Sequence, residues 1–253
     1  MNQDVLKQYG WNDTWAALLP MGAYPARVIR QDHDLYRVVG PSGEMNARVT
    51  GKMIYAAADE ADYPAVGDWV AVDRDSDAQG DASIGQILAR RSVFVRKAAG
   101  SGQAVQVVAA NVDKVFICMA LNADYNLRRL ERYLTIAWDS GAQPVVVLTK
   151  ADLCGDLPQK LAEVSLASAG CPVVVSSALH QEGLEQVRQL AAPGKTVAFI
   201  GSSGVGKSTL INYLLGEERL ATAEIGQNEK GRHTTTYRQL YVLPEGGMVI
   251  DTP

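Results

Sequence analysis

Residues 196–208, which read TVAFIGSSGVGKS, are the most informative part of the sequence. An apolar, β-branched run is followed by a glycine-rich loop and then by residues with helical composition, at 208–215. The loop matches the pattern GxxxxGK[ST], in which backbone N–H groups and a helix N-terminus converge on phosphate oxygens. This predicts a site for a nucleoside triphosphate. The motif consists of Gly201, Ser202, Ser203, Gly204, Val205, Gly206, Lys207 and Ser208.

The motif predicts specific roles for two of its side chains. Lys207 should reach the β- and γ-phosphates, and Ser208 should ligate Mg²⁺, with Thr209 next in the helix. The alternative is a glycine-rich turn that holds a Lys-Ser pair by chance. The strand before the motif and the helix after it favour the phosphate-binding interpretation.

A second motif bears on which base is bound. A strand at residues 144–148 is followed by Thr149, Lys150, Ala151 and Asp152, which resemble the guanine-recognition motif [NT]KxD. The Asp152 carboxylate can accept hydrogen bonds from guanine N1–H and its 2-amino group, whereas adenine would leave that charge unpaired. The alternative is a plain strand-to-helix turn. The next strand ends in a loop that resembles one approaching guanine O6, formed by Ser176, Ser177 and Ala178.

The C-terminal part of the chain predicts an α/β fold with a doubly wound parallel sheet. Apolar runs typical of strands buried on both faces alternate with segments of helical spacing, and the last two runs can form a hairpin. The predicted strands are residues 115–121, 144–148, 172–175, 196–200, 240–243 and 248–250. The predicted helices are residues 127–138, 157–167, 184–191 and one beginning at 208.

The N-terminal part of the sequence has a different secondary-structure pattern. Five short β-rich runs, separated by turn residues and without a long helix, predict a five-stranded all-β barrel of the OB type. We therefore divide the chain into residues 1–22 as an N-terminal extension, 23–97 as the barrel, 98–110 as a small-residue linker and 111–253 as the α/β domain.

Composition limits the function classes. The chain has 253 residues and a net charge of −4, and neither part is strongly basic, which excludes a binder that relies on global charge attraction to nucleic acid. The three cysteines show no metal-ligand spacing and suit a reducing cytosol. No run approaches the roughly 20 apolar residues of a membrane span. We expect a cytoplasmic, monomeric protein with no membrane partner.

The order of the motifs is unusual, because the guanine motif precedes the phosphate loop. Compact domains tolerate such rearrangement since their termini often lie close together. With this order, the chain resembles the circularly permuted bacterial GTPases that depend on the small ribosomal subunit, the RsgA family. The matching segments are residues 149–152, 201–209, 231–236 (GRHTTT), 251–253 (DTP) and the strand entry at 111–113 (NVD).

This resemblance implies an OB-fold, a circularly permuted GTPase domain and a C-terminal zinc domain. It implies GTP and GDP as ligands, Mg²⁺ as cofactor, and binding to the 30S subunit and its 16S rRNA late in assembly, with GTP hydrolysis there. The sequence stops at Pro253, one residue before the glycine of the family's DxxG motif, so we expect Zn²⁺ only in a domain that it lacks. The alternative is a nucleotide-dependent RNA- or ribosome-binding module with negligible hydrolysis.

Some site residues have competing interpretations. His233 either approaches the attacking water or is a solvated loop histidine. Of the three threonines that follow, we choose Thr235 as the ligand of Mg²⁺ and the γ-phosphate, and we expect Asp251 to hold Mg²⁺ through water. A basic stretch around Phe94 either contacts RNA, with Phe94 stacking on a base, or is a solvated strand edge. That stretch contains Arg90, Arg91, Arg96 and Lys97.

Overall fold

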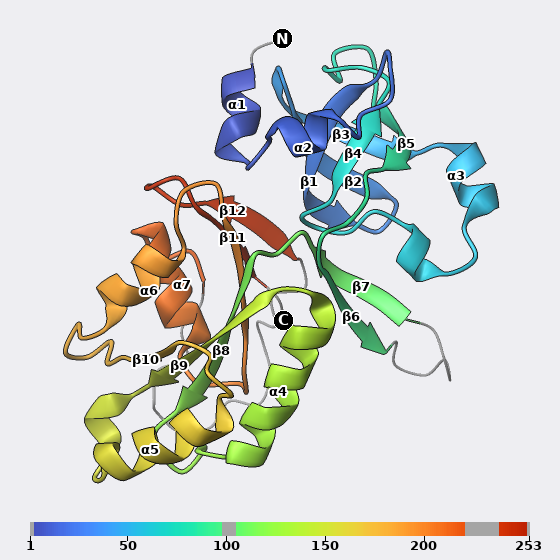
Figure 1. The fold of residues 1–253 in the computed structure, drawn as a ribbon. Coiled ribbons are helices and arrows are strands. Elements are labelled where there is room, and N and C mark those ends of the chain that lie inside the picture. Colours follow the sequence, from blue (N-terminus) through green and yellow to red (C-terminus); the bar gives the residue numbers. More distant parts are fainter. Residues whose placement is uncertain (1–2, 98–104, 221–237, 252–253) are drawn as a thin grey trace, which may run out of the picture.

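The computed structural model describes residues 3–97, 105–220 and 238–251 of the chain. These residues form a β-barrel beside a larger α/β layer (Figure 1). None of the helices in these three ranges has the length and apolar character that a membrane span requires.

The barrel closes through five strands, as predicted. Strand β1 pairs with β2 on one side and with β4 on the other, and β3 lies parallel to β5. The order β1-β2-β3-β5-β4 returning to β1 is that of an OB-like barrel. Its interior is apolar, with Val28, Val38 and Ile84 fully buried. The strands are β1 (Tyr24–Asp32), β2 (Leu35–Gly40), β3 (Gly43–Val49), β4 (Trp69–Val72) and β5 (Ala82–Ile87).

Two short helical segments join β3 to β4. They are the helix α3 (Gly51–Ala56) and the 3-10 turn η1 (Glu60–Asp62). Thr50 begins α3, and its side chain accepts a hydrogen bond from the N–H of Met53. Asp59 and Asp62 cap η1 reciprocally. Both segments lie on the outside of the barrel and leave its interior intact (Figure 1).

The α/β domain has a parallel sheet in the order β10-β9-β8-β11-β13, which confirms the predicted class, and β12 pairs antiparallel with β13 as the expected hairpin. The strands are β8 (Lys114–Ala120), β9 (Gln143–Thr149), β10 (Val173–Val175), β11 (Thr196–Ile200), β12 (Gln239–Val242) and β13 (Met248–Asp251). The helices are α4 (Leu127–Ser140), α5 (Leu157–Ala167), α6 (Leu184–Leu190) and α7 (Lys207–Leu215), with the 3-10 turn η2 (Ala151–Leu153).

Helices cover both faces of this sheet, which explains why its strands read as continuous apolar runs. On one face, Leu130 of α4 and Val164 of α5 pack in a cluster with Ile117. On the other face, residues of α6 and α7 such as Val187 pack in a cluster with Phe116. Successive residues of β8 therefore face opposite cores.

A separate hairpin lies between the two domains. It is formed by β6 (Val93–Lys97) and β7 (Val105–Ala110), which pair antiparallel. The second half of the segment expected as a linker is therefore strand β7. Residues 98–104 of that segment lie outside the described residues.

The N-terminal segment packs into the molecule. Its helices are α1 (Gln3–Gln8) and α2 (Asp13–Ala16). Trp11 and Trp15 are buried against Trp69 of the barrel, with ring centroids 4.7 and 6.2 Å away. These three rings form a compact apolar cluster with Leu6 and Leu88, which anchors the segment to the barrel.

Candidate nucleotide-binding site

The loop between β11 and α7 has a backbone that requires glycine. Gly201, Gly204 and Gly206 have φ angles of +153°, +74° and +101°. A Cβ atom on Gly201 would lie 2.5 Å from the carbonyl oxygen of Cys118 on the neighbouring strand, closer than atoms can approach. The loop can therefore fold tightly over the end of the sheet and present its backbone at the start of α7.

Lys207 is the first residue of α7 and bends back over the loop. Its ammonium group donates hydrogen bonds to the carbonyl oxygens of Gly201 and Ser202, at 2.7 and 2.8 Å. Burial lowers the pKa of Lys207, and the nearby carboxylates of Asp251 and Asp124 oppose this shift. The loop thus combines a partly buried cation with a helix N-terminus, an arrangement that favours an anion.

Asp251 lies at the same edge of the sheet. It is the last residue of β13, which runs parallel to β11, so the carboxyl ends of the two strands meet there. Burial raises the pKa of Asp251, and the positive charge of Lys207 counteracts this. A carboxylate beside the phosphate loop is positioned to attract a divalent cation.

Residues 149–152, which resemble the guanine motif, are hydrogen-bonded directly to the phosphate loop. The hydroxyl of Thr149 donates a hydrogen bond to the carbonyl oxygen of Val205 at 2.5 Å. The ammonium group of Lys150 donates to the carbonyl oxygen of Gly204 at 2.8 Å. Two segments more than 50 residues apart in sequence therefore form one site.

The Asp152 carboxylate is held by the neighbouring loop. The Ser177 hydroxyl donates to Asp152 Oδ1 at 2.5 Å. The backbone N–H of Ala151 donates to the carbonyl oxygen of Ser176 at 3.1 Å, which ties the two loops together. One carboxylate oxygen is thus fixed in orientation, and the geometry leaves the group able to accept further hydrogen bonds.

These loops enclose a pocket of about 310 Å³. Its apolar walls include Leu153, Leu179 and Leu210, which the sequence analysis did not identify. Leu153 and Leu179 each directly follow a motif residue, and both are exposed, at 54% and 77%. The only signal in the sequence is their position, because each leucine directly follows a residue of a polar motif. The pocket is lined by Thr149, Lys150, Asp152, Leu153, Ser176, Ala178, Leu179, Gly206, Thr209 and Leu210.

The chemistry of this pocket suits a flat heterocyclic base. Apolar side chains can contact the ring faces, and Asp152 can accept hydrogen bonds from N–H groups at the ring edge. The phosphate loop is adjacent, since Gly206, Thr209 and Leu210 also line the pocket. The arrangement therefore accommodates a base and its phosphates side by side.

Other predicted site residues are placed only in part. Ser208 is the second residue of α7, next to Lys207. His233 and Thr235 lie outside the described residues, as does the rest of residues 221–237. Within the described ranges, no group of three or more His, Cys, Asp and Glu side chains could hold a metal ion. A zinc site therefore has no ligand set in this part of the chain.

The hypothesis that Phe94 stacks on RNA is wrong. Phe94 is 4% exposed and belongs to the main apolar core. Arg90 is also engaged, because its guanidinium pairs with Asp68 at 2.7 Å and its side chain is only 15% exposed. Arg91 lies with its guanidinium 4.3 Å from the ring centroid of Trp15. Strand alternation turns Phe94 inward, and the buried Asp68 carboxylate requires a cationic partner.

Comparisons with known proteins agree with this geometry. The sequence profile described as RsgA GTPase matches residues 87–253. A Lactiplantibacillus plantarum protein named small ribosomal subunit biogenesis GTPase RsgA 2 is 54% identical over 92% of this chain and 65% of its own length. A protein of Opitutus terrae, named small ribosomal subunit biogenesis GTPase RsgA, is 45% identical over 98% of this chain and 71% of its own length. The chain thus spans about two thirds of these relatives.

Two solved structures share the fold. The crystal structure of YjeQ from Thermotoga maritima matches with a TM-score of 0.68 and 24% identity, over 91% of this chain and 74% of that one. The crystal structure of YloQ, described as a circularly permuted GTPase, matches with a TM-score of 0.64 and 20% identity, over 92% of this chain and 72% of that one. The barrel followed by a permuted α/β domain is therefore an established architecture.

Proposed function

The chain belongs to the RsgA GTPase family, and we propose that it binds guanine nucleotides and hydrolyses GTP during biogenesis of the small ribosomal subunit. The observation that carries this proposal is the Asp152 carboxylate, held by Ser177 in a pocket that adjoins the phosphate loop. Guanine offers this carboxylate two N–H donors, and adenine offers neither. Binding adenine would leave the carboxylate with the Ser177 hydroxyl but without the two ring donors, at a cost of about 1–3 kcal/mol.

The remaining pocket residues have distinct proposed roles. The aliphatic stem of Lys150 lies along the base while its ammonium group holds Gly204. The backbone of Ser176, Ser177 and Ala178 approaches the base edge. The loop from Gly201 to Gly206 wraps the phosphates, and Lys207 exchanges its contacts with loop carbonyls for contacts with the β- and γ-phosphates.

Two described residues fit a magnesium site. The Ser208 hydroxyl and the Asp251 carboxylate are hard oxygen donors of the kind that Mg²⁺ prefers, and Asp251 lies at the strand edge beside the phosphate loop. We assign Thr235 as a further ligand. When bound, Mg²⁺ neutralises charge that develops on the phosphate oxygens. We assign His233 to the attacking water, and both residues belong to the catalytic set proposed here.

We further propose the 30S subunit and its 16S rRNA as partners, in the cytoplasm, with the chain acting as a monomer. The names of its relatives support the small subunit as the partner. The barrel has a filled apolar core, and both the barrel and the β6–β7 hairpin present outward-facing side chains to solvent. RNA contacts would therefore come from surface groups other than Phe94.

The test is GTP turnover by this chain with and without purified 30S subunits. We expect turnover that rises with subunit concentration and is lost in Lys207→Ala. A chain that binds GTP and subunits but shows no turnover above the Lys207→Ala background would instead be a nucleotide-dependent ribosome-binding module. Failure to bind guanine nucleotides at all would refute the proposal.

A further inference from the structure

A single buried arginine joins the barrel to the strands that carry the nucleotide site. Arg27, on β1, is 2% exposed, and its guanidinium has five N–H donors. Each donor has an acceptor, and the acceptors come from five separate segments of the chain. They are the carbonyl oxygen of Tyr9, Gly67 O at 3.3 Å, Asn111 O at 3.5 Å, Thr196 Oγ1 at 2.8 Å and Met248 Sδ at 3.1 Å.

Two of these acceptors lie at the starts of functional strands. Thr196 is the first residue of β11, which leads into the phosphate loop at Gly201. Met248 is the first residue of β13, which ends at Asp251. Both strands are short, and they pair in parallel from these first residues, with Thr196 opposite Met248 and Ala198 opposite Ile250. Arg27 thus contacts the first residues of two strands whose other ends lie at the phosphate loop and at Asp251.

Arg27 is a buried cation, and its stability depends on the hydrogen-bond acceptors around it. Burial lowers the pKa of Arg27 to about 10, which still leaves the group protonated at neutral pH. Its acceptors are carbonyl, hydroxyl and thioether groups rather than a directly bonded carboxylate. A buried cation of this kind is stable only while every acceptor stays in place, because each lost hydrogen bond leaves part of the charge uncompensated.

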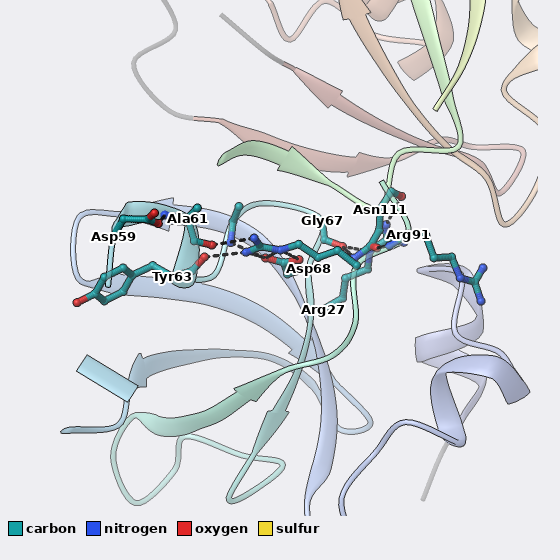
Figure 2. Close-up of polar contacts among 10 residues, drawn as sticks. Arg27, Asp59, Ala61, Tyr63, Gly67, Asp68, Arg91 and Asn111 are labelled. Carbon is teal, nitrogen blue, oxygen red and sulfur yellow. Dashed lines mark hydrogen bonds and ion pairs between the residues drawn. The ribbon is translucent and has the colours of Figure 1, made fainter. Parts of the chain in front are cut away.

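The residues around Arg27 form the contact region between the barrel and the α/β domain, which we call the joint (Figure 2). A Cβ atom on Gly67 would lie 2.1 Å from Ala110 O, at the end of β7, and 3.0 Å from Ile250 Cδ1 in the α/β domain. Asn111, with a φ angle of +55°, donates from Nδ2 to Gly67 O at 3.1 Å and accepts from the N–H of Arg91 at 2.9 Å. Its side chain thus connects the barrel loop with the segment that enters β6.

A buried ion pair fixes the barrel side of this joint. Arg90 binds the Asp68 carboxylate, which is fully buried, and also donates to the carbonyl oxygens of Ala61 and Tyr63, each at 2.8 Å (Figure 2). The backbone N–H of Val28 donates to Asp68 O at 2.9 Å. The loop that carries Gly67 is therefore held to β1 on both sides, next to Arg27.

A second connection runs through the sheet itself. Strand β12 pairs with β13 and also with barrel strand β1, where Arg30 lies opposite Gln239, so one sheet continues from the barrel into the α/β domain. Arg238, just before β12, donates to Gln106 Oε1 at 3.1 Å on the intervening hairpin. The two domains therefore share both hydrogen-bonded backbone and a buried side chain.

We propose that Arg27 is a positioning residue for the nucleotide site, through which the barrel and the phosphate-binding strands behave as one cooperative unit. Binding at either domain then changes the affinity at the other by the same factor. The nucleotide part of this inference rests on the proposed guanine-nucleotide site. The cooperative unit itself does not, and the experiment separates the two.

The first arm needs no nucleotide. In a Trp138→Phe background, the three remaining tryptophans all lie in the cluster beside Arg27, so their emission reports on the joint, while far-ultraviolet circular dichroism reports on the helices. In urea, we expect the two signals to change together in the parent and to separate in Arg27→Gln. Thr196→Val, which removes one acceptor, should give a smaller separation. Arg37→Gln removes an exposed barrel ion pair and is the matched control, with coincident signals.

The second arm uses GDP and hydrogen exchange. We expect GDP to slow exchange of β1 and β4 amides as well as β11 amides in the parent, and only those of the α/β domain in Arg27→Gln. GDP affinity should fall about tenfold in that variant, within the range typical of coupled sites. Coincident urea transitions in Arg27→Gln, or GDP protection of its barrel equal to the parent's, would overturn the inference. If GDP fails to bind the parent, the proposed function fails while the urea arm still decides whether Arg27 couples the domains.

Discussion

The two ends of strands β11 and β13 differ in how they are built. At their N-terminal ends, Thr196 and Met248 are buried and hydrogen-bonded to a guanidinium from another domain. At their C-terminal ends, a glycine-rich loop and Asp251 border a pocket with exposed leucines. The first end is tightly packed and the second borders a pocket. Substitutions at the first should therefore lower stability and, through Arg27, also nucleotide affinity, whereas those at the second should affect ligand binding with little change in stability.

The largest effect should come from the pocket end. Lys207→Ala removes the cation that we propose binds the phosphates, and we expect GTP turnover to be abolished and binding to weaken by roughly 2–5 kcal/mol, by analogy with truncated buried charge pairs. Titration calorimetry and a turnover assay measure both. The urea midpoint should stay near that of the parent. Unchanged nucleotide affinity would show that the phosphates bind elsewhere.

At the tightly packed end, Gly67→Ala should destabilise the fold by about 3 kcal/mol, because its Cβ would overlap Ala110 O and its φ angle of +96° is unfavourable for alanine. Urea denaturation measures the free energy of unfolding. Gly80→Ala is the matched control, since Gly80 has a φ angle of +111° but open space around it. The control isolates the cost of the backbone angle, about 1 kcal/mol. Equal losses in the two variants would refute the close approach at Gly67.

Asp152→Asn, at the pocket end of the strands, should weaken nucleotide binding without changing the stability of the fold. The amide can no longer accept from both guanine donors, so we expect GDP binding to weaken by about 2 kcal/mol and xanthine nucleotides to bind better than in the parent. Competition titrations with GDP and XDP measure the change. A variant that binds GDP as tightly as the parent would remove Asp152 from the site.

The smallest effect is expected at the pocket rim. Leu179→Ala should weaken guanine-nucleotide binding by about 1 kcal/mol, since in the proposed site the leucine lines the pocket that takes the base. Its side chain is 77% exposed, so the urea midpoint should not move. Leu166→Ala on α5, at a residue 88% exposed and outside the pocket, is the control and should change neither property. Similar binding losses in both variants would argue against a base at Leu179.

Short sequence patterns were enough to predict the buried strands, the glycine-rich loop and the barrel. The apolar runs at β8, β9 and β11 indicated strands buried on both faces, and the glycines of residues 201–206 indicated a backbone that only glycine adopts readily. The predicted barrel is confirmed for a related reason. Its five short runs alternate with turns, and a sheet of that size covers its apolar face by closing on itself.

Contacts between distant segments were not predictable in this way. Nothing in the local sequence of β1 indicates that Arg27 reaches β11 and β13, because an arginine in a strand reads as a solvated edge residue. The same reasoning misplaced Phe94, whose basic neighbours suggested a surface although alternation turns its ring inward. The pairing of β1 with β12 also depends on how two domains pack, which no single stretch encodes.

The most direct test of the guanine-nucleotide site is a calorimetric titration of this chain with GDP and, separately, with ADP. We predict one GDP bound per chain, with an affinity roughly 10- to 100-fold higher than that for ADP, because only guanine supplies the two further donors for the Asp152 carboxylate. Equal affinity for the two nucleotides, or no binding of GDP, would contradict the assignment of this pocket.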